Sequence, residues 1–188
     1  MEKDKLKKIL QKTGVLMEGH FELSSGRHAG RYLQCARVLQ YPEYTKFLAK
    51  SIASMWKDEK IDTVIGPALG GVVLAYAVGA ELQCRAIFSE RKDKNMEIRR
   101  GFSINSGENI LIVEDVVTTG GSVREVINLL QRKKANIIGI SSLINRGKNI
   151  NFKYSFKPLL NLNIKSYQPD NCPLCQKNIP FYKPGSQK

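Results

Sequence analysis

The sequence predicts an α/β protein whose central sheet is parallel. From residue 61 onward, short apolar or β-branched runs alternate with stretches of helical periodicity. Two of these runs, residues 109–113 and 136–144, are rich in apolar residues, which is typical of strands buried on both faces of a parallel sheet. Between them, residues 123–130 place apolar side chains at the spacing of an amphipathic helix. Strand–helix–strand alternation of this kind indicates an α/β domain.

The other elements follow from the same two periodicities. Apolar residues at helical spacing predict three further helices, at residues 3–12, 43–57 and 70–82. Short β-rich runs predict strands at 62–66 and 84–88, and the mixed stretch 22–34 predicts a turn that opens into a strand. Residues 89–101, SERKDKNMEIRRG, are charged and show no periodicity, so we expect a loop there. The proline-containing tail after residue 165 is expected to have little regular structure.

Length and composition favour one soluble globular domain. A chain of 188 residues is long enough to bury a sizeable core, and 42% hydrophobic with 25% charged residues is ordinary for such a domain. No apolar run approaches the roughly 20 residues of a membrane helix. The N-terminal stretch MEKDKLKKILQK lacks the apolar core of a signal peptide. We therefore expect a cytoplasmic protein without a membrane partner.

The net charge of +13 is compatible with nucleic acid, a membrane surface or a small polyanionic ligand. The basic residues are spread along the chain, and no array of aromatic and arginine residues of the RNA-binding kind is visible. Most of the lysines are therefore interpreted as a solvated surface, and no nucleic-acid partner is expected. Charge alone does not choose the ligand.

Residues 109–122, NILIVEDVVTTGGS, contain a candidate phosphate loop. Gly120 and Gly121 let the backbone approach a ligand closely, and the amides of 119–122 stand at the start of a predicted helix, where an anion is favoured. Thr118, Thr119 and Ser122 add hydroxyl donors. The spacing is not that of a Walker A loop. By itself the loop could equally be a helix N-cap made by a threonine or serine.

Two acids, Glu114 and Asp115, directly precede this loop. A carboxylate pair repels a phosphate at short range, whereas carboxylates accept hydrogen bonds strongly from hydroxyl groups. A sugar phosphate presents a phosphate at one end and a diol in the middle. The acids and the loop together therefore favour a sugar-phosphate ligand over a simple helix cap.

The pattern of apolar run, Glu-Asp, and Thr-Thr-Gly-Gly-Ser resembles the phosphoribosyl-pyrophosphate (PRPP) motif of type I phosphoribosyltransferases. Four further segments resemble the orotate phosphoribosyltransferase family: FELSSGRHAGRYLQ its N-terminal substrate segment, VIGPALGG its diphosphate loop, FSERKD the start of its mobile catalytic loop, and LINRG its orotate-carboxylate segment. The matches run in family order from about residue 15 to residue 147. The resemblance implies one domain over residues 1–188, with an N-terminal hood at about 1–40, a core at about 41–165 and a tail at about 166–188.

The resemblance implies transfer of the phosphoribosyl group from PRPP to orotate, giving orotidine 5′-monophosphate and diphosphate, with Mg²⁺ as cofactor and no protein side chain ligating it directly. The ribose hydroxyls would be accepted by Glu114 and Asp115, and Asp115 would also lie near the growing positive charge. The 5′-phosphate would be bound by the loop residues Val116, Val117, Thr118, Thr119, Gly120, Gly121 and Ser122. The diphosphate would be bound through backbone amides of Ala68, Leu69 and Gly70.

The same segment, VIGPALGG, could also be a tight turn between strand and helix. In the family a non-proline cis peptide is common here, and it would fall at Ala68-Leu69. Orotate would contact Thr118, Arg146, Tyr32 and Leu33. Without the family context, Arg146 could be a surface arginine at a strand end.

The mobile loop, or lid, would supply Arg91, Lys92 and Lys94 to the departing diphosphate. For Arg99 and Arg100, a solvated loop is a better interpretation than it is for Arg91 and Lys92. In the family the lid reaches the neighbouring subunit's site, which implies a homodimer.

Two departures from the family pattern change the set of cations. Ser24 stands where many relatives have a lysine, and a lid histidine found in others is absent near Met96. Arg27 or Arg31 could compensate for the missing charge.

The four cysteines fall into two classes. Cys35 and Cys84 stand in apolar surroundings and are interpreted as packing residues. Cys172 and Cys175 form a Cys-x-x-Cys, half of the four-ligand set that structural zinc requires. A second tail across a dimer or a histidine could complete the set; otherwise the two are a free cysteine pair in a packed tail.

Two other functions remain as alternatives. A phosphoribosyltransferase for a purine base would share the PRPP motif, although Arg146 and the segment ELSSGR favour orotate. A catalytically silent, PRPP-sensing regulator that binds nucleic acid is compatible with the charge. The chain shows no additional helix-turn-helix segment, and its acids and lid lysines are intact, which argues against the regulator.

Overall fold

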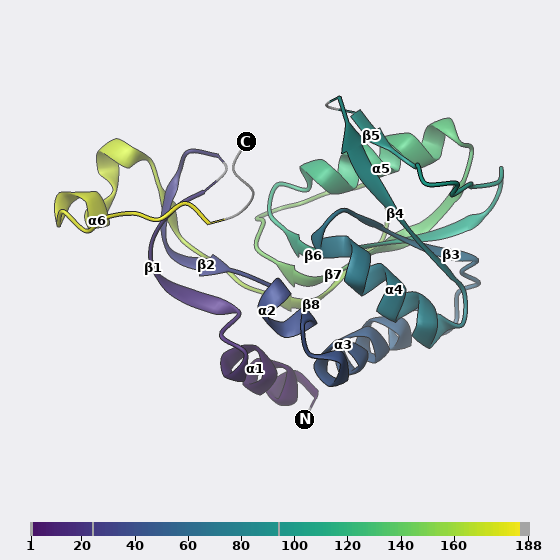
Figure 1. Ribbon diagram of the computed structural model, residues 1–188, viewed down its shortest axis with the longest axis horizontal. Coiled ribbons are helices and arrows are strands. Elements are labelled where there is room, and N and C mark those ends of the chain that lie inside the picture. Colours follow the sequence, from purple (N-terminus) through teal and green to yellow (C-terminus); the bar gives the residue numbers. More distant parts are fainter. Residues whose placement is uncertain (1, 24, 94, 185–188) are drawn as a thin grey trace. The chain divides into compact units, whose positions relative to one another are not determined.

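The computed structural model describes residues 2–23, 25–93 and 95–184. The chain forms two compact units (Figure 1). The first unit combines both chain ends, Met1–Val38 and Asn163–Lys188, and the second is the continuous segment Leu39–Leu162. The expected hood and tail thus fall into one unit, and the division of 1–188 as a single domain stays a prediction. Within the described ranges, none of the helices has the length and apolar character needed to cross a membrane.

The second unit contains the parallel sheet that the sequence predicts. Its strand order is β5-β4-β3-β6-β7-β8, and only β5 runs antiparallel to its neighbour. The strands are β3 (Thr63–Pro67), β4 (Arg85–Lys92), β5 (Asn95–Glu97), β6 (Asn109–Val117), β7 (Asn136–Asn145) and β8 (Phe156–Asn161). Every residue of β3 is buried, as are Ile110 to Glu114 of β6, so apolar runs at these positions are required on both faces.

Three helices flank this sheet: α3 (Pro42–Ser54), α4 (Gly70–Leu82) and α5 (Gly121–Arg132). The connection β3–α4–β4 moves along the sheet in one direction and β6–α5–β7 moves in the other. Right-handed crossovers therefore place α4 and α5 on opposite faces, as Figure 1 shows, with α3 beside α4. The connections from β3 and β6, which are parallel neighbours, thus leave toward opposite edges of the sheet. In open α/β sheets, ligands bind beyond the carboxyl ends of the strands at such a switch point.

The core of this unit shows why β7 has a glycine at position 139. The Trp56 indole is almost wholly buried and donates a hydrogen bond from Nε1 to Ser141 Oγ at 2.8 Å. A Cβ added at Gly139 would lie only 2.5 Å from the Cζ3 atom of that indole, so the ring occupies the space that a side chain would need. The ammonium of Lys157 lies 3.9 Å from the ring centroid, which adds a cation–π contact.

The prediction of a loop at residues 89–101 is wrong. Strand β4 continues to Lys92, a turn follows with Asp93 in the left-handed region, and β5 pairs back onto β4. The reason is one apolar anchor: the Met96 side chain is buried in the same cluster as Val123 and Val126. A short antiparallel ribbon needs only one buried face, and a single inward residue among charged neighbours leaves no periodicity in the sequence.

The first unit is a three-stranded antiparallel sheet, β1-β2-β9, with short helical segments. Its elements are α1 (Glu2–Lys12), β1 (Leu16–Glu22), β2 (His28–Leu33), β9 (Ser166–Tyr167), η1 (Pro169–Asn171) and α6 (Pro173–Gln176), and the short α2 (Ala36–Leu39) ends it. Three apolar residues of α1, Leu6, Ile9 and Leu10, are buried. The tail contains only elements of two to four residues up to residue 184, as its prolines predict.

Candidate active site

The candidate phosphate loop joins β6 to α5. Gly120 is the N-cap of α5, with a φ of 78°, and no side chain hydrogen-bonds to the cap. A Cβ at this position would lie 2.6 Å from Phe152 Cε1, so both the backbone conformation and the space require glycine. Because a glycine rather than a threonine or serine occupies the cap, the first-turn amides of this 12-residue helix remain for an anion.

The acid pair lies at the carboxyl end of β6, directly before this loop. Glu114 is 9% exposed and Asp115 is half-buried. The Asp115 amide donates to Glu114 Oε1 at 3.2 Å, and the Val116 amide donates to Asp115 Oδ1 at 2.7 Å. Burial, and then the negative charge of Asp115, raise the pKa of Glu114 well above its ordinary value.

The predicted diphosphate segment lies against these acids. A Cβ built on Gly70 would come within 2.5 Å of Asp115 Cγ, so the start of α4 touches the carboxylate and only glycine fits. The peptide Ala68-Leu69 is cis, at the place that the resemblance implies. The Ala68 amide donates to the Ser89 carbonyl at 2.7 Å, which connects this segment to the first residue of the predicted lid.

The predicted orotate arginine follows β7 at the same edge of the sheet. The Arg146 amide donates to the Val117 carbonyl at 2.8 Å. At Gly147 an added Cβ would overlap the Thr118 carbonyl oxygen, so this backbone packs directly on the phosphate loop. Two predicted orotate contacts, Thr118 and Arg146, therefore come from adjoining segments.

The predicted lid cations occupy the β4–β5 hairpin and the residues after it. The Arg91 guanidinium forms a fork with Glu125 of α5, with donor–acceptor distances of 2.8 and 3.1 Å. Arg99 and Arg100 both pair with Glu90, in keeping with their interpretation as surface residues. The side chain of Lys92 is exposed. Lys94 lies outside the described residues.

The remaining predicted substrate residues are in the first unit, on β2. Leu33 is buried, and the Tyr32 ring packs at 5.7 Å from that of Phe21. Arg27, offered above as a compensating cation, donates to Ser166 Oγ at 2.9 Å and to its carbonyl at 2.6 Å, so it holds β9. Arg31 pairs with Glu18 at 3.0 Å. Ser24 lies outside the described residues, and the compensation stays a prediction.

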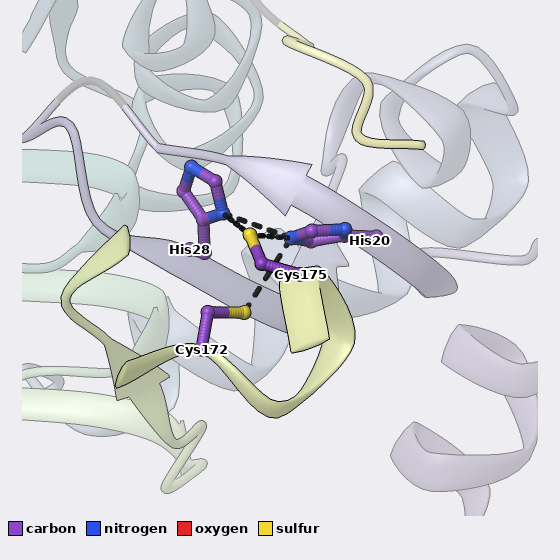
Figure 2. Close-up of side chains that lie close together, drawn as sticks. All are labelled: His20, His28, Cys172 and Cys175. Carbon is purple, nitrogen blue, oxygen red and sulfur yellow. Dashed lines mark hydrogen bonds between the residues drawn. The ribbon is translucent and has the colours of Figure 1, made fainter. Parts of the chain in front are cut away.

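The cysteine pair of the tail meets both histidines of the chain. Cys172 and Cys175 lie beside His20 of β1 and His28 of β2, and Figure 2 shows the four side chains converging. The sequence interpretation allowed a histidine to complete the set but did not identify which. The signal that was available is that only two histidines exist and that they flank one turn, eight residues apart.

Comparisons with known proteins identify the family to which the chain is similar. A family model described as "Phosphoribosyl transferase domain" matches residues 38–168. The chain is 49% identical to an orotate phosphoribosyltransferase of Thermoanaerobacter sp. (strain X514) over 100% of both chains. It is also 49% identical to that of Thermotoga maritima, over 97% of this chain and 98% of the relative.

Solved structures share the fold. The orotate phosphoribosyltransferase of Aeropyrum pernix has a TM-score of 0.72 at 23% identity, covering 84% of this chain and 93% of that one. An orotate phosphoribosyltransferase of Mycobacterium tuberculosis H37Rv in complex with inorganic phosphate has a TM-score of 0.70 at 20% identity, covering 86% and 96%.

Proposed function

The chain belongs to the orotate phosphoribosyltransferase family, and we propose that it transfers the 5-phosphoribosyl group from PRPP to orotate in pyrimidine (UMP) biosynthesis. The products would be orotidine 5′-monophosphate and diphosphate, formed in the cytoplasm. One observation supports the proposal above others: the Glu114–Asp115 pair stands between two helix N-termini, at Gly70 and Gly121.

This arrangement suits each part of PRPP. The amides at the start of α5, with the hydroxyls of Thr118, Thr119 and Ser122, would hold the 5′-phosphate. Residues Val116, Val117, Gly120 and Gly121 would contribute backbone to the same subsite. The start of α4, with Ala68, Leu69 and Gly70, would bind the diphosphate, and the acids between the two loops would accept the ribose hydroxyls.

The chemistry follows from charge. Breaking the bond at the anomeric carbon leaves positive charge on the ribose and negative charge on the diphosphate. The Asp115 carboxylate would stabilise the positive charge on the ribose. The lid cations and the α4 amides would stabilise the negative charge on the diphosphate. Mg²⁺ would neutralise charge on the diphosphate while keeping much of its hydration, so its water ligands would face Glu114 and Asp115. No direct side-chain ligation of Mg²⁺ is required.

Recognition of the base would rest on Arg146. A planar guanidinium matches a carboxylate, the group that orotate has and purine bases lack. Thr118 adjoins this segment. The orotate contacts of Tyr32 and Leu33 stay predictions from the family resemblance. The test is to combine protein, PRPP, Mg²⁺ and orotate and to follow the loss of orotate absorbance. Turnover of adenine or hypoxanthine instead would overturn the assignment, and salt-sensitive RNA or DNA binding without turnover would favour a regulator.

We further propose a homodimer in which the lid of one subunit serves the site of the other. Three apolar side chains on one side of α4 are exposed: Leu69 at 86%, Val73 at 46% and Tyr76 at 74%. Their i, i+4, i+7 spacing places them in one continuous apolar strip on the helix. Single exposed apolar residues are ordinary on a monomer, whereas a continuous strip is typical of an interface. A second copy of this chain is the occupant that we assign to the strip.

A mixing experiment tests the shared lid through Lys92. The Lys92→Ala protein is expected to lose turnover far more than stability, whereas Lys57→Ala, at an exposed site outside the lid, should behave as the parent. Lys92→Ala and Asp115→Asn should each be inactive alone. If lids act in trans, heterodimers contain one intact site, and random re-association recovers about a quarter of the parental activity. No recovery despite confirmed heterodimers would mean that each lid serves its own subunit.

A further inference from the structure

We propose that His20, His28, Cys172 and Cys175 form a structural zinc site that joins the two ends of the chain. One ligand atom from each residue, an imidazole nitrogen or a thiol sulfur, lies within 4.8 Å of all the others. The histidines come from the β1–β2 hairpin and the cysteines from the start of α6 (Figure 2). All four residues belong to the first unit.

The distances fit a tetrahedral ion. Zinc binds sulfur at about 2.3 Å and imidazole nitrogen at about 2.0 Å, which gives ligand–ligand edges of about 3.3 to 3.8 Å. His20 Nε2 lies 3.5 Å from Cys172 Sγ and 3.8 Å from Cys175 Sγ. His28 Nδ1 lies 3.2 Å from Cys175 Sγ and 2.9 Å from His20 Nε2. Shifts of a few tenths of an ångström would bring these four distances to tetrahedral values, and the longest separation among the ligand atoms, up to 4.8 Å, would have to shorten by about 1 Å.

The tautomer of His20 is fixed in the form that binds a metal. Its Nδ1 lies 2.7 Å from the Ile179 carbonyl oxygen, which can only accept a hydrogen bond. Nδ1 therefore carries the proton, and Nε2 presents its lone pair to the other three residues. Metal-bound histidines usually donate their second ring nitrogen in this way, which orients the ring.

Hydrogen bonding alone does not account for every close approach to His20 Nε2 in this cluster. Three groups surround His20 Nε2 within 3.8 Å: the His28 ring nitrogen and the two thiols. A nitrogen lone pair accepts one good hydrogen bond, so in a metal-free cluster only one of these three neighbours can donate to His20 Nε2. One cation at the centre would use the lone pairs of all four groups.

The surroundings are those of a closed site. His20, His28 and Cys172 are each less than 6% exposed, and Cys175 is partly buried. The Phe181 ring packs on both imidazoles, with centroid distances of 5.7 and 4.9 Å. Four protein ligands leave no position for a substrate or water, so the site is structural rather than catalytic. A set of two nitrogens and two sulfurs in tetrahedral array selects zinc over magnesium or calcium.

The role follows from where the ligands sit in the chain. His20 and Cys172 are 152 residues apart. Beyond β9 the tail also contacts the hairpin through backbone hydrogen bonds of Tyr182 with His20 and Glu22. An ion would fasten the tail onto the hairpin as a covalent crosslink does, in a chain whose four cysteines are all free.

Metal analysis of the reduced, tag-free protein tests the proposal. We expect one zinc per chain in the parent and in Cys84→Ser, which changes a cysteine outside the cluster, and less than about a tenth of that in Cys175→Ser. A chelator strong enough to strip zinc should expose two additional thiols to a thiol reagent and lower the melting temperature of the parent but not of Cys175→Ser. Cobalt substitution should give the visible spectrum of a tetrahedral thiolate site.

Each alternative result overturns the proposal. Folded, reduced parent protein without zinc, even after zinc is supplied, would identify a free cysteine pair. Zinc retained in full by Cys175→Ser would place the ion elsewhere. If Cys175→Ser does not fold, the chelation experiment on the parent decides alone, since an unchanged thiol count and melting temperature exclude a bound ion.

Discussion

Replacing Glu114 with glutamine should stabilise the ligand-free protein at neutral pH. The pKa of Glu114 is raised above its ordinary value of 4.5 by burial and by Asp115. An acid with a raised folded-state pKa stabilises the fold fully at pH values below the unfolded pKa, and this stability is lost as pH rises toward the folded pKa. At pH 7 the loss is at most about 3.5 kcal/mol, because this pH is about 2.5 pH units above 4.5 and one pH unit corresponds to about 1.4 kcal/mol. Glutamine at position 114 keeps an oxygen that can accept the hydrogen bond from the Asp115 amide, and it removes the titratable carboxyl group.

The measurement is urea unfolding between pH 5 and pH 8, followed by fluorescence. Trp56 is the only tryptophan and is buried in the same unit, so its signal reports on the sheet that carries Glu114. The free energy of unfolding of the parent should fall with pH relative to that of Glu114→Gln, and the difference should shrink steadily as the pH is lowered toward 5. Glu59→Gln, at an exposed position, should follow the parent. Parallel pH profiles for parent and Glu114→Gln would refute the reasoning.

Two further predictions concern packing in the second unit. Gly70→Ala should displace the Asp115 carboxylate and reduce PRPP affinity and turnover by about 100-fold. Gly79→Ala, on the same helix as Gly70, would bring a Cβ to 2.9 Å from that of Ala86 in β4, and it should cost about 1–3 kcal/mol of stability with normal turnover of the folded protein. Calorimetric PRPP titration and thermal melting separate the two effects. Trp56→Phe should lower the free energy of unfolding by about 1–3 kcal/mol, because it leaves the Ser141 hydroxyl unpaired. Urea unfolding monitored by circular dichroism measures this loss. Ser141→Ala should cost less stability when added to Trp56→Phe than when made in the parent protein.

The parts of the site that lie within one strand–loop–helix unit could be predicted from the sequence. Residues 109–122 contain the buried strand, the acids and the helix start in one stretch, so local periodicity and residue chemistry placed them correctly. The predicted helix at 70–82 coincides with α4 for the same reason. The cis peptide at Ala68-Leu69 came from family resemblance, because no local pattern encodes it.

The parts that depend on contacts between distant segments were missed or left open. The β4–β5 hairpin depends on Met96 reaching the cluster under α5, which charged neighbours conceal in the sequence. Residues 156–161 were not assigned as a strand, although β8 closes one edge of the sheet by pairing with β7. The partners of Cys172 and Cys175 could not be chosen, because the pairing of β1 with β2 and the return of the tail bring them together.

The discontinuous make-up of the first unit fixes an order of events during synthesis. Leu39–Leu162 is continuous, so all its strands are available before the last residues leave the ribosome. The first 38 residues, in contrast, emerge first and must wait for residue 166 to provide the third strand of their sheet. The nascent chain therefore carries the β1–β2 hairpin without its third strand for most of its elongation. Residues 166–167 are therefore the segment that completes this sheet, and a chain that ended before them would leave the β1–β2 hairpin without its third strand.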